Sequence, residues 1–192
     1  MANEERRSFL RWAIHGMGAI FAAVLGIPAV AYLADARHRP APNRGFRPVQ
    51  GIKLNELVVD EPRQGVIRDV RTDAWTLHPN DVVGRVWVVK TGQAAPNDLM
   101  VFTTICPHLG CSINRDAGNP CPGFTCPCHG GKFNINGSLD QAVANNPAPR
   151  GMDSLEFETA HDPENPDPNN RNLLLVKYQN FVQGEHEKKA KT

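Results

Sequence analysis

Two short segments constrain the fold of this chain more than any other feature: CPHLGC at 106–111 and CPCHGG at 126–131. Each carries two cysteines and a histidine, and together they hold four of the five cysteines in the sequence. Such clustering indicates cysteines placed for chemistry, because five are few for a disulfide scaffold of this length. A single site built from both segments requires the two loops to meet, and its candidate ligands are Cys106, His108, Cys126 and His129.

Two kinds of metal site suit a set of two thiolates and two imidazoles. One is a tetrahedral zinc ion, although zinc modules usually separate paired ligands by two or more residues and the pair Cys106-x-His108 is tighter. The other is a [2Fe–2S] cluster in which two cysteines bind one iron and two histidines bind the other. The tight spacing favours the cluster, and a zinc-stabilised structural module remains the alternative.

The paired boxes, with 17 residues between His108 and Cys126, resemble those of the Rieske iron–sulfur subunit of cytochrome bc-type complexes, the quinol:cytochrome c oxidoreductases. The resemblance also covers a single N-terminal anchor, a linker and a β-rich head. It implies one Rieske-type [2Fe–2S] cluster, with Cys106 and Cys126 on the buried iron. His108 and His129 would then bind the outer iron.

The resemblance also accounts for the remaining cysteine of each box. In this family these two cysteines form a disulfide that ties the cluster loops together, and here they are Cys111 and Cys128. Such a bridge persists only on an oxidising face of the membrane. The fifth cysteine, Cys121, lies outside the pattern, and the sequence leaves open whether it competes for Cys111.

Further residues near the boxes match the family pattern. The segment NNPAPRGM at 145–152 resembles the proline loop that covers the cluster, with Pro147 and Pro149 as a stiff wall that lacks N–H donors. Asn146 stands where the family usually has glycine. Leu109 is implied to be an exposed apolar contact at the quinol pocket.

Two positions depart from the family pattern. Gly131 and Phe133 stand where many members have Ser and Tyr, whose hydroxyl groups hydrogen-bond the cluster sulfurs and favour the reduced state. If each missing bond removes about 1–2 kcal/mol of differential stabilisation, the potential falls by tens of millivolts per bond. We therefore expect a low-potential cluster, suited to menaquinol rather than ubiquinol.

A candidate membrane anchor occupies residues 12–33, which contain no Asp, Glu, Lys or Arg. As a helix this segment would be about 33 Å long, enough to cross a bilayer. Residues 1–11 form a predicted cytoplasmic N-terminus, where RRSFL at 6–10 resembles a twin-arginine export signal. We expect an uncleaved, single-pass protein of the bacterial cytoplasmic membrane, with its head on the outer, periplasmic face.

The rest of the chain is predicted to be mainly β. Residues 34–48 are rich in Pro, Arg and Ala without periodicity, which indicates a flexible linker, and 184–192 are predicted to be a disordered tail. Residues 49–183 are predicted to form a Rieske-type antiparallel β head, with a small cluster-binding subdomain whose loops span about 103–150. Asn136-Gly137 is a hairpin signal. The β-like runs lie at 66–70, 83–92, 99–105, 154–160 and 172–182.

The resemblance implies an electron-transfer subunit that is not catalytic alone. It would take an electron from quinol at a cytochrome b partner, with the proton passing to a ligand histidine, His129 or His108. It would then pass the electron to a c-type cytochrome within a dimeric, multi-subunit complex. Because an imidazole bound to iron keeps one nitrogen for a proton, the potential is expected to fall as pH rises. The linker would let the head swing between the two partners.

Other readings remain at this point. The small Rieske subunit of an arsenite oxidase-like molybdoenzyme is also exported by twin arginine and would carry electrons without quinol chemistry. Soluble Rieske ferredoxins and oxygenase components lack both an anchor and the cysteines matched by Cys111 and Cys128, which argues against them. The net charge of +1 without a large basic block argues against nucleic acid as a partner.

Overall fold

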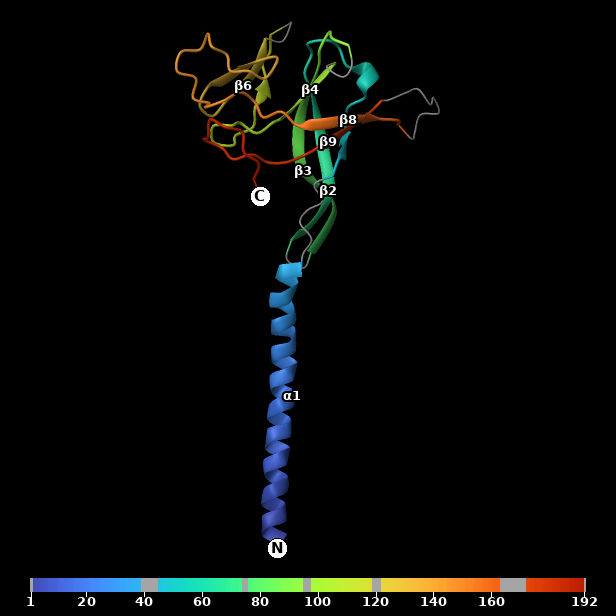
Figure 1. Ribbon diagram of the computed structural model, residues 1–192, viewed down its shortest axis with the longest axis vertical. Helices are drawn as coiled ribbons and strands as arrows, with labels where there is room; N and C mark the ends of the chain where they lie inside the picture. The colour runs from blue at the N-terminus through green and yellow to red at the C-terminus, as the bar shows by residue number, and fades with distance from the viewer. Residues whose placement is uncertain are drawn as a thin grey trace. The chain divides into compact units, whose positions relative to one another are not determined.

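The computed structural model describes residues 2–38, 45–73, 76–94, 98–118, 122–162 and 172–191 (Figure 1). The chain divides into two units, Met1–Asn43 and Arg44–Thr192. Residues 39–44 of the predicted linker lie outside the described residues, as does Cys121.

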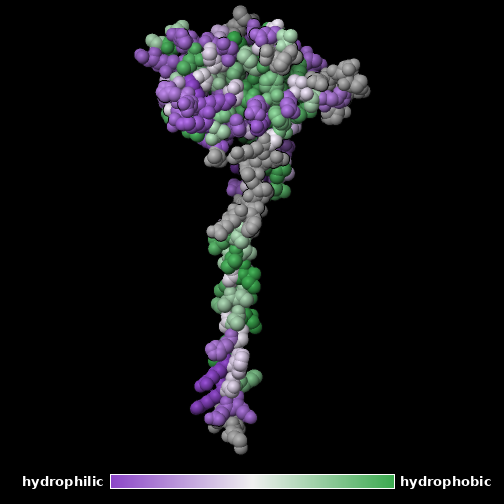
Figure 2. All heavy atoms as spheres, in the orientation of Figure 1, coloured by the Kyte–Doolittle hydropathy of each residue, from purple (hydrophilic) through white to green (hydrophobic). Residues whose placement is uncertain are grey.

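The first unit contains one α-helix, α1 (Ala2–His38). Its segment Glu4–Ala34 is long and apolar enough to cross a membrane, and the expected anchor at 12–33 lies within it. The large apolar side chains of this segment are exposed, and Figure 2 shows hydrophobic residues along its central turns and hydrophilic ones near its N-terminus. A long apolar helix without a buried face is consistent with membrane anchoring.

The helix extends beyond the predicted anchor. The sequence assigns residues 34–38 to the linker, but they continue α1 to His38. The physical reason is local: Ala34 and Ala36 favour a helix, and the next helix-breaking residue after Pro28 is Pro40.

The second unit is built on a six-stranded antiparallel sheet with strand order β4–β3–β2–β1–β9–β8. The short strand β1 pairs with β2 on one side and β9 on the other, which joins the beginning and the end of the head. A single turn of 3-10 helix, Leu54–Glu56, follows β1. The strands are β1 (Arg47–Gln50), β2 (Arg63–Asp73), β3 (Thr76–Lys90), β4 (Leu99–Thr103), β8 (Glu156–Ala160) and β9 (Leu173–Lys177).

A second sheet of three antiparallel strands carries one of the two boxes, and Figure 1 shows it apart from the larger sheet. Its strands are β5 (Asn114–Arg115), β6 (Gly123–Cys126) and β7 (Gly131–Asn134). The predicted turn at Asn136-Gly137 is confirmed, because the Asn134 N–H donates to the Ser138 carbonyl at 2.8 Å and Gly137 has a φ of 78°. The mainly β head with a small subdomain is therefore confirmed.

Strand β3 separates two hydrophobic cores. Side chains alternate across a strand, so Val86 and Val88 enter one core while Trp87 and Val89 enter the other. This explains why VWVV is buried without a polar face. The second core lies beneath the boxes, where the Trp87 indole N–H donates to the Ile113 carbonyl at 3.0 Å.

The C-terminus differs from the expected disordered tail. Residues 180–191 form an antiparallel pair, here called the C-terminal hairpin. The Val182 N–H donates to the Lys189 carbonyl and the Lys191 N–H to the Asn180 carbonyl, both at 2.8 Å. Composition pointed to a frayed tail because the segment is strongly charged. Its order comes instead from contacts with residues distant in sequence.

Candidate metal centre

The first box forms a closed loop directly after β4. The Cys106 N–H donates to the Cys111 carbonyl at 2.8 Å, which joins the two ends of the loop. The Gly110 N–H donates back to the Cys106 carbonyl at 3.0 Å, and Gly110 has a φ of 86°. Glycine is favoured there because an L side chain rarely adopts that backbone conformation. We call residues 106–111 loop 1.

The second box forms the turn between β6 and β7, with Cys126 paired opposite Gly131. We call residues 126–131 loop 2. Here too the glycine four residues after the first cysteine, Gly130, donates its N–H to that cysteine's carbonyl, at 3.0 Å and with a φ of 73°. Both loops therefore share the pattern Cys-Pro-x-x-Gly. This backbone repeat is visible in the sequence but was missed by reasoning on metal ligands alone.

The four predicted ligands lie in these loops as two pairs, one of thiols and one of imidazoles. Cys106 and Cys126 are 1% and 2% exposed and free of disulfides, and the two thiols are close enough for Cys126 to raise the pKa of Cys106. The rings of His108 and His129 meet edge to face with centroids 4.8 Å apart. His108 is half-buried and His129 is exposed. Solvent exposure therefore increases from the two buried thiols to the two imidazoles.

Burial raises the pKa of the Cys106 thiol to about 11, and the neighbouring Cys126 thiol adds to this rise. Hydrogen bonds from the backbone N–H groups of His108 and Leu109 lower the same pKa. A metal ion held by this sulfur would bind it as the thiolate, so the thiol would have to give up its proton. The two N–H donors would then stabilise the sulfur's negative charge.

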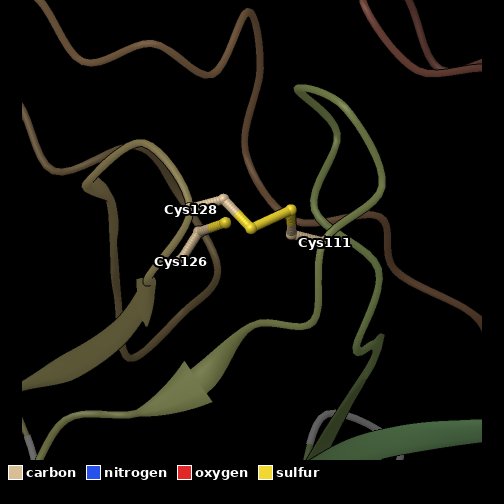
Figure 3. A group of neighbouring side chains, drawn as sticks. All are labelled: Cys111, Cys126 and Cys128. Carbon is tan, nitrogen blue, oxygen red and sulfur yellow. A yellow bond between two sulfur atoms is a disulfide. The ribbon is translucent and has the colours of Figure 1, made fainter.

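The expected disulfide between Cys111 and Cys128 is present. Figure 3 shows it linking loop 1 to loop 2, with the Cys126 side chain next to it. The sulfur atoms of Cys111, Cys126 and Cys128 all lie within 4.8 Å of one another. Since two of these sulfurs are bonded to each other, Cys126 is the one free thiol of this group, and the bridge serves to hold the loops together.

The segment matched to the proline loop lies beside loop 2. The Asn146 side-chain N–H donates to the Lys132 carbonyl at 2.7 Å, and its Oδ1 accepts from the Ala148 N–H at 3.3 Å. The Asn146 side-chain N–H thus fastens the proline loop to β7, while its Oδ1 stabilises the turn of the loop itself. Pro147 Cγ lies 3.7 Å from the position that a Cβ on Gly131 would occupy.

The two predicted tuning positions lie on one face of β7. Gly131 and Phe133 are two residues apart on the strand and both are buried. Phe133 packs in the second core, and Gly131 lies against Cys126 and the proline loop. Neither residue has a hydroxyl group. Leu109, the predicted quinol contact, is 65% exposed at the tip of loop 1.

A [2Fe–2S] cluster fits this donor set. Two adjacent buried thiols suit one iron, and two neighbouring imidazoles suit the other. A cluster with this ligand set supplies one-electron redox chemistry. The fold and the donor set together define an iron–sulfur protein of the two-cysteine, two-histidine class.

Comparison with known proteins agrees with this class. The profile of the Rieske [2Fe-2S] domain matches residues 65–156. The chain is 30% identical to the menaquinol:cytochrome c reductase iron-sulfur subunit of Bacillus subtilis, over 69% of this chain and 75% of that protein. It is 28% identical to the corresponding subunit of Geobacillus thermodenitrificans, over 80% and 85% of the two chains. The cytochrome b6-f complex iron-sulfur subunit of Chlorobaculum thiosulfatiphilum is 30% identical, over 70% and 62%.

The chain belongs to the family of Rieske iron–sulfur subunits of cytochrome bc-type complexes, and its cofactor is a [2Fe–2S] cluster.

Proposed function

We propose that this chain transfers electrons from menaquinol at a cytochrome b subunit to a c-type cytochrome. Cys106 and Cys126 hold the inner iron, and His108 and His129 hold the outer one. The observation that carries the proposal is the graded donor set, in which the thiols are buried and the His129 ring is exposed. Of these four residues, His129 is the exposed one, so a donor molecule would approach from the imidazole side.

The residues of the two loops have different roles in this proposal. His129 offers the ring nitrogen that does not bind iron, accepts a hydrogen bond from the quinol hydroxyl, and takes its proton as the electron leaves. His108 lies beside it and completes the polar end of the site. Leu109 presents an exposed apolar side chain that packs against the quinol ring. Ala148 and Met152 of the proline loop segment share the second core with Cys106 and Cys126, which keeps water away from the inner sulfurs.

Two observations support menaquinol as the substrate. The relatives from Bacillus subtilis and Geobacillus thermodenitrificans are named for menaquinol. Gly131 and Phe133 also offer no hydroxyl to the cluster sulfurs. Asn146 directs its amide oxygen toward Gly131, 3.6 Å from the position of a Cβ there, and an amide oxygen accepts hydrogen bonds rather than donating them. A cluster with fewer donors to its sulfurs has a lower potential and suits a more strongly reducing quinol.

The proposal places the protein in a dimeric, multi-subunit complex of a bacterial cytoplasmic membrane. Helix α1 is the anchor, with its N-terminus in the cytoplasm, and the head lies on the outer face. That side is oxidising, which suits the Cys111–Cys128 bridge. The segment after α1 acts as a tether on which the head moves between cytochrome b and the c-type cytochrome.

An EPR-monitored redox titration of the complex tests this proposal. We expect a Rieske-type spectrum from the reduced protein and a midpoint in the lower part of the roughly −150 to +300 mV range of such centres. A midpoint near the upper end would contradict the assignment to menaquinol. Purification with a molybdopterin subunit rather than with cytochrome b would contradict quinol oxidation, and a colourless, EPR-silent protein would contradict the cluster.

A further inference from the structure

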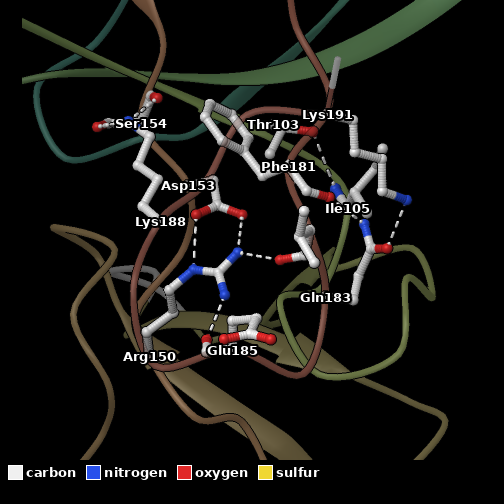
Figure 4. Close-up of polar contacts among 11 residues, drawn as sticks. Thr103, Ile105, Arg150, Asp153, Ser154, Phe181, Gln183, Glu185, Lys188 and Lys191 are labelled. Atoms are coloured by element: carbon white, nitrogen blue, oxygen red, sulfur yellow. Dashed lines mark hydrogen bonds and ion pairs between the residues drawn. The ribbon is translucent and has the colours of Figure 1, made fainter.

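Arg150 lies in the proline loop segment, directly after Pro149, and connects it to the C-terminal hairpin. Its guanidinium group forms a bidentate ion pair with Asp153, with N–O distances of 2.9 and 2.8 Å. The same group donates to the carbonyl oxygens of Val182, at 2.9 Å, and Glu185 (Figure 4). The Arg150 and Asp153 side chains are only 10% and 4% exposed, so this bidentate ion pair is almost completely shielded from water.

The carbonyls that receive these bonds belong to the C-terminal hairpin. Phe181 anchors the hairpin in the first core at 3% exposure, and Lys188 fastens its other strand to Ser154. The tip reaches the proline loop a second time, where His186 Nδ1 lies 3.2 Å from the Pro149 carbonyl. The hairpin is therefore attached to the head at several points and is not a loose tail.

The tip of the hairpin also holds loop 1. The Gly184 N–H donates to the Pro107 carbonyl at 2.8 Å, between Cys106 and His108. Pro107 is buried and has no N–H, so its carbonyl is the one backbone polar group through which a neighbour can fix it. Next to this bond, the Gln183 side chain lies 3.8 Å from the position of a Cβ on Gly110.

Loop 1 is thus held from two sides by different means. The disulfide fixes its end at Cys111 to loop 2, and the hairpin fixes its beginning at Pro107. His108 and Leu109 lie between these two points, and they are the loop 1 residues that face the quinol in the proposed function.

We propose that Arg150 is a positioning residue. Through the C-terminal hairpin it sets the orientation of His108 and Leu109, and so governs quinol engagement. This inference rests on the proposed ligand set and quinol reaction. It adds a role for residues 180–191, which carry none of the predicted ligands.

Gly184 offers the sharpest test, because its φ is 78° and a Cβ there would meet no atom closer than the His108 carbonyl at 3.9 Å. Steric space is available, so the backbone conformation alone decides the effect of a side chain. Asparagine tolerates this conformation, whereas the β-branched valine does not. Gly184→Val should move the N–H away from Pro107, and Gly184→Asn should keep it in place.

The variants are measured in the complete complex by EPR, redox titration and steady-state quinol oxidation. Gly184→Val should retain the cluster, since the four ligands and the disulfide are unchanged. It should broaden the EPR lines and lower kcat/KM for quinol by about tenfold, less than the roughly hundredfold loss that a 1 Å misplacement can cause. Gly184→Asn should match the wild type. Arg150→Lys should resemble Gly184→Val, because lysine keeps the charge near Asp153 but loses the planar fork.

The hairpin inference is overturned if Gly184→Val has wild-type line shape and wild-type kinetics, or if Gly184→Asn is as impaired as Gly184→Val. If the Arg150→Lys protein does not assemble into the complex, the comparison of Gly184→Val with Gly184→Asn still tests whether the hairpin affects quinol oxidation. Failure of the proposed function would look different, because the wild-type complex itself would then lack a Rieske spectrum or quinol oxidation.

Discussion

Replacing Gly131 by serine tests how this chain sets the potential of its cluster. A Cβ at this position would lie 3.7 Å from both Cys126 Cβ and Pro147 Cγ, which are ordinary contacts, so serine fits without displacing the backbone. The new hydroxyl would lie next to a cluster ligand and could donate to a sulfur. Such a bond favours the reduced cluster, because reduction adds a negative charge, and it should raise the midpoint potential.

The size of the rise follows from the energy of one hydrogen bond. If the bond is worth about 1–2 kcal/mol more in the reduced state, and about 1.4 kcal/mol corresponds to roughly 59 mV for one electron, the expected rise is about 40–85 mV.

Asn146 limits this effect in the single variant. Its Oδ1 would lie 3.6 Å from the new Cβ and would compete with the sulfur for the serine proton. Gly131→Ser alone should therefore give a rise near the lower value. The same change combined with Asn146→Ala should give a rise nearer the upper one.

The assay is an EPR-monitored redox titration at constant pH, with Gly131→Ala as the matched control that adds the methyl group without the hydroxyl. Asn146→Ala alone corrects for the loss of its bond to the Lys132 carbonyl. If serine raises the potential no more than alanine does in both backgrounds, the argument that a missing hydroxyl lowers this potential is wrong.

Three further predictions concern stability, pH and substrate contact. Replacing Cys111 and Cys128 by serine removes a disulfide between residues 17 positions apart, so the free energy of unfolding should fall by about 3 kcal/mol. The cluster should then lose its colour at a lower urea concentration than in the wild type. Loss of colour at the wild-type urea concentration would contradict this prediction. Burial raises the pKa of the Tyr178 phenol, while a hydrogen bond with Thr103 lowers it. The folded state then holds this proton to higher pH than the unfolded chain does. Stability should therefore fall as pH rises above about 10, and Tyr178→Phe should flatten that slope in urea titrations; an equal slope in both proteins would refute the assignment. Leu109→Ala should raise KM for quinol and leave the midpoint potential and unfolding unchanged, because this side chain is 65% exposed and belongs to neither of the two described cores. A shifted potential would place Leu109 in the cluster environment instead.

Much of the site could be predicted from the sequence because its chemistry lies in short, contiguous boxes. Residue types at close spacing are enough to propose a thiolate–imidazole ligand set, and the resemblance that the boxes carry supplies the Cys111–Cys128 bridge found in the structure. The candidate anchor segment could also be predicted from the sequence, since a helix that spans a bilayer needs a long run of apolar residues. The five β-like runs contribute residues to β2, β3, β4, β8 and β9. They could be recognised because β-branched residues are enriched in half-buried strands.

The smaller sheet was not predicted as strands. β5 is two residues long, and β6 begins at Gly123. Their local composition indicates loop rather than strand. β5 and β6 pair because β6 also pairs with β7 and because Phe124 packs in the second core. These contacts cannot be predicted from the residues next to each strand in the sequence.

The sequence by itself indicated the chemistry of this protein, because closely spaced cysteines and histidines, apolar length and strand patterning are properties of neighbouring residues. Only the tertiary structure decided how that chemistry is held. Asn146 fastens the proline loop, and a charged C-terminal segment becomes a hairpin that contacts Pro107 and Arg150. Hydrogen bonds of this kind join residues that are not neighbours in the sequence. Their stability depends on burial and geometry that exist only once the chain has folded.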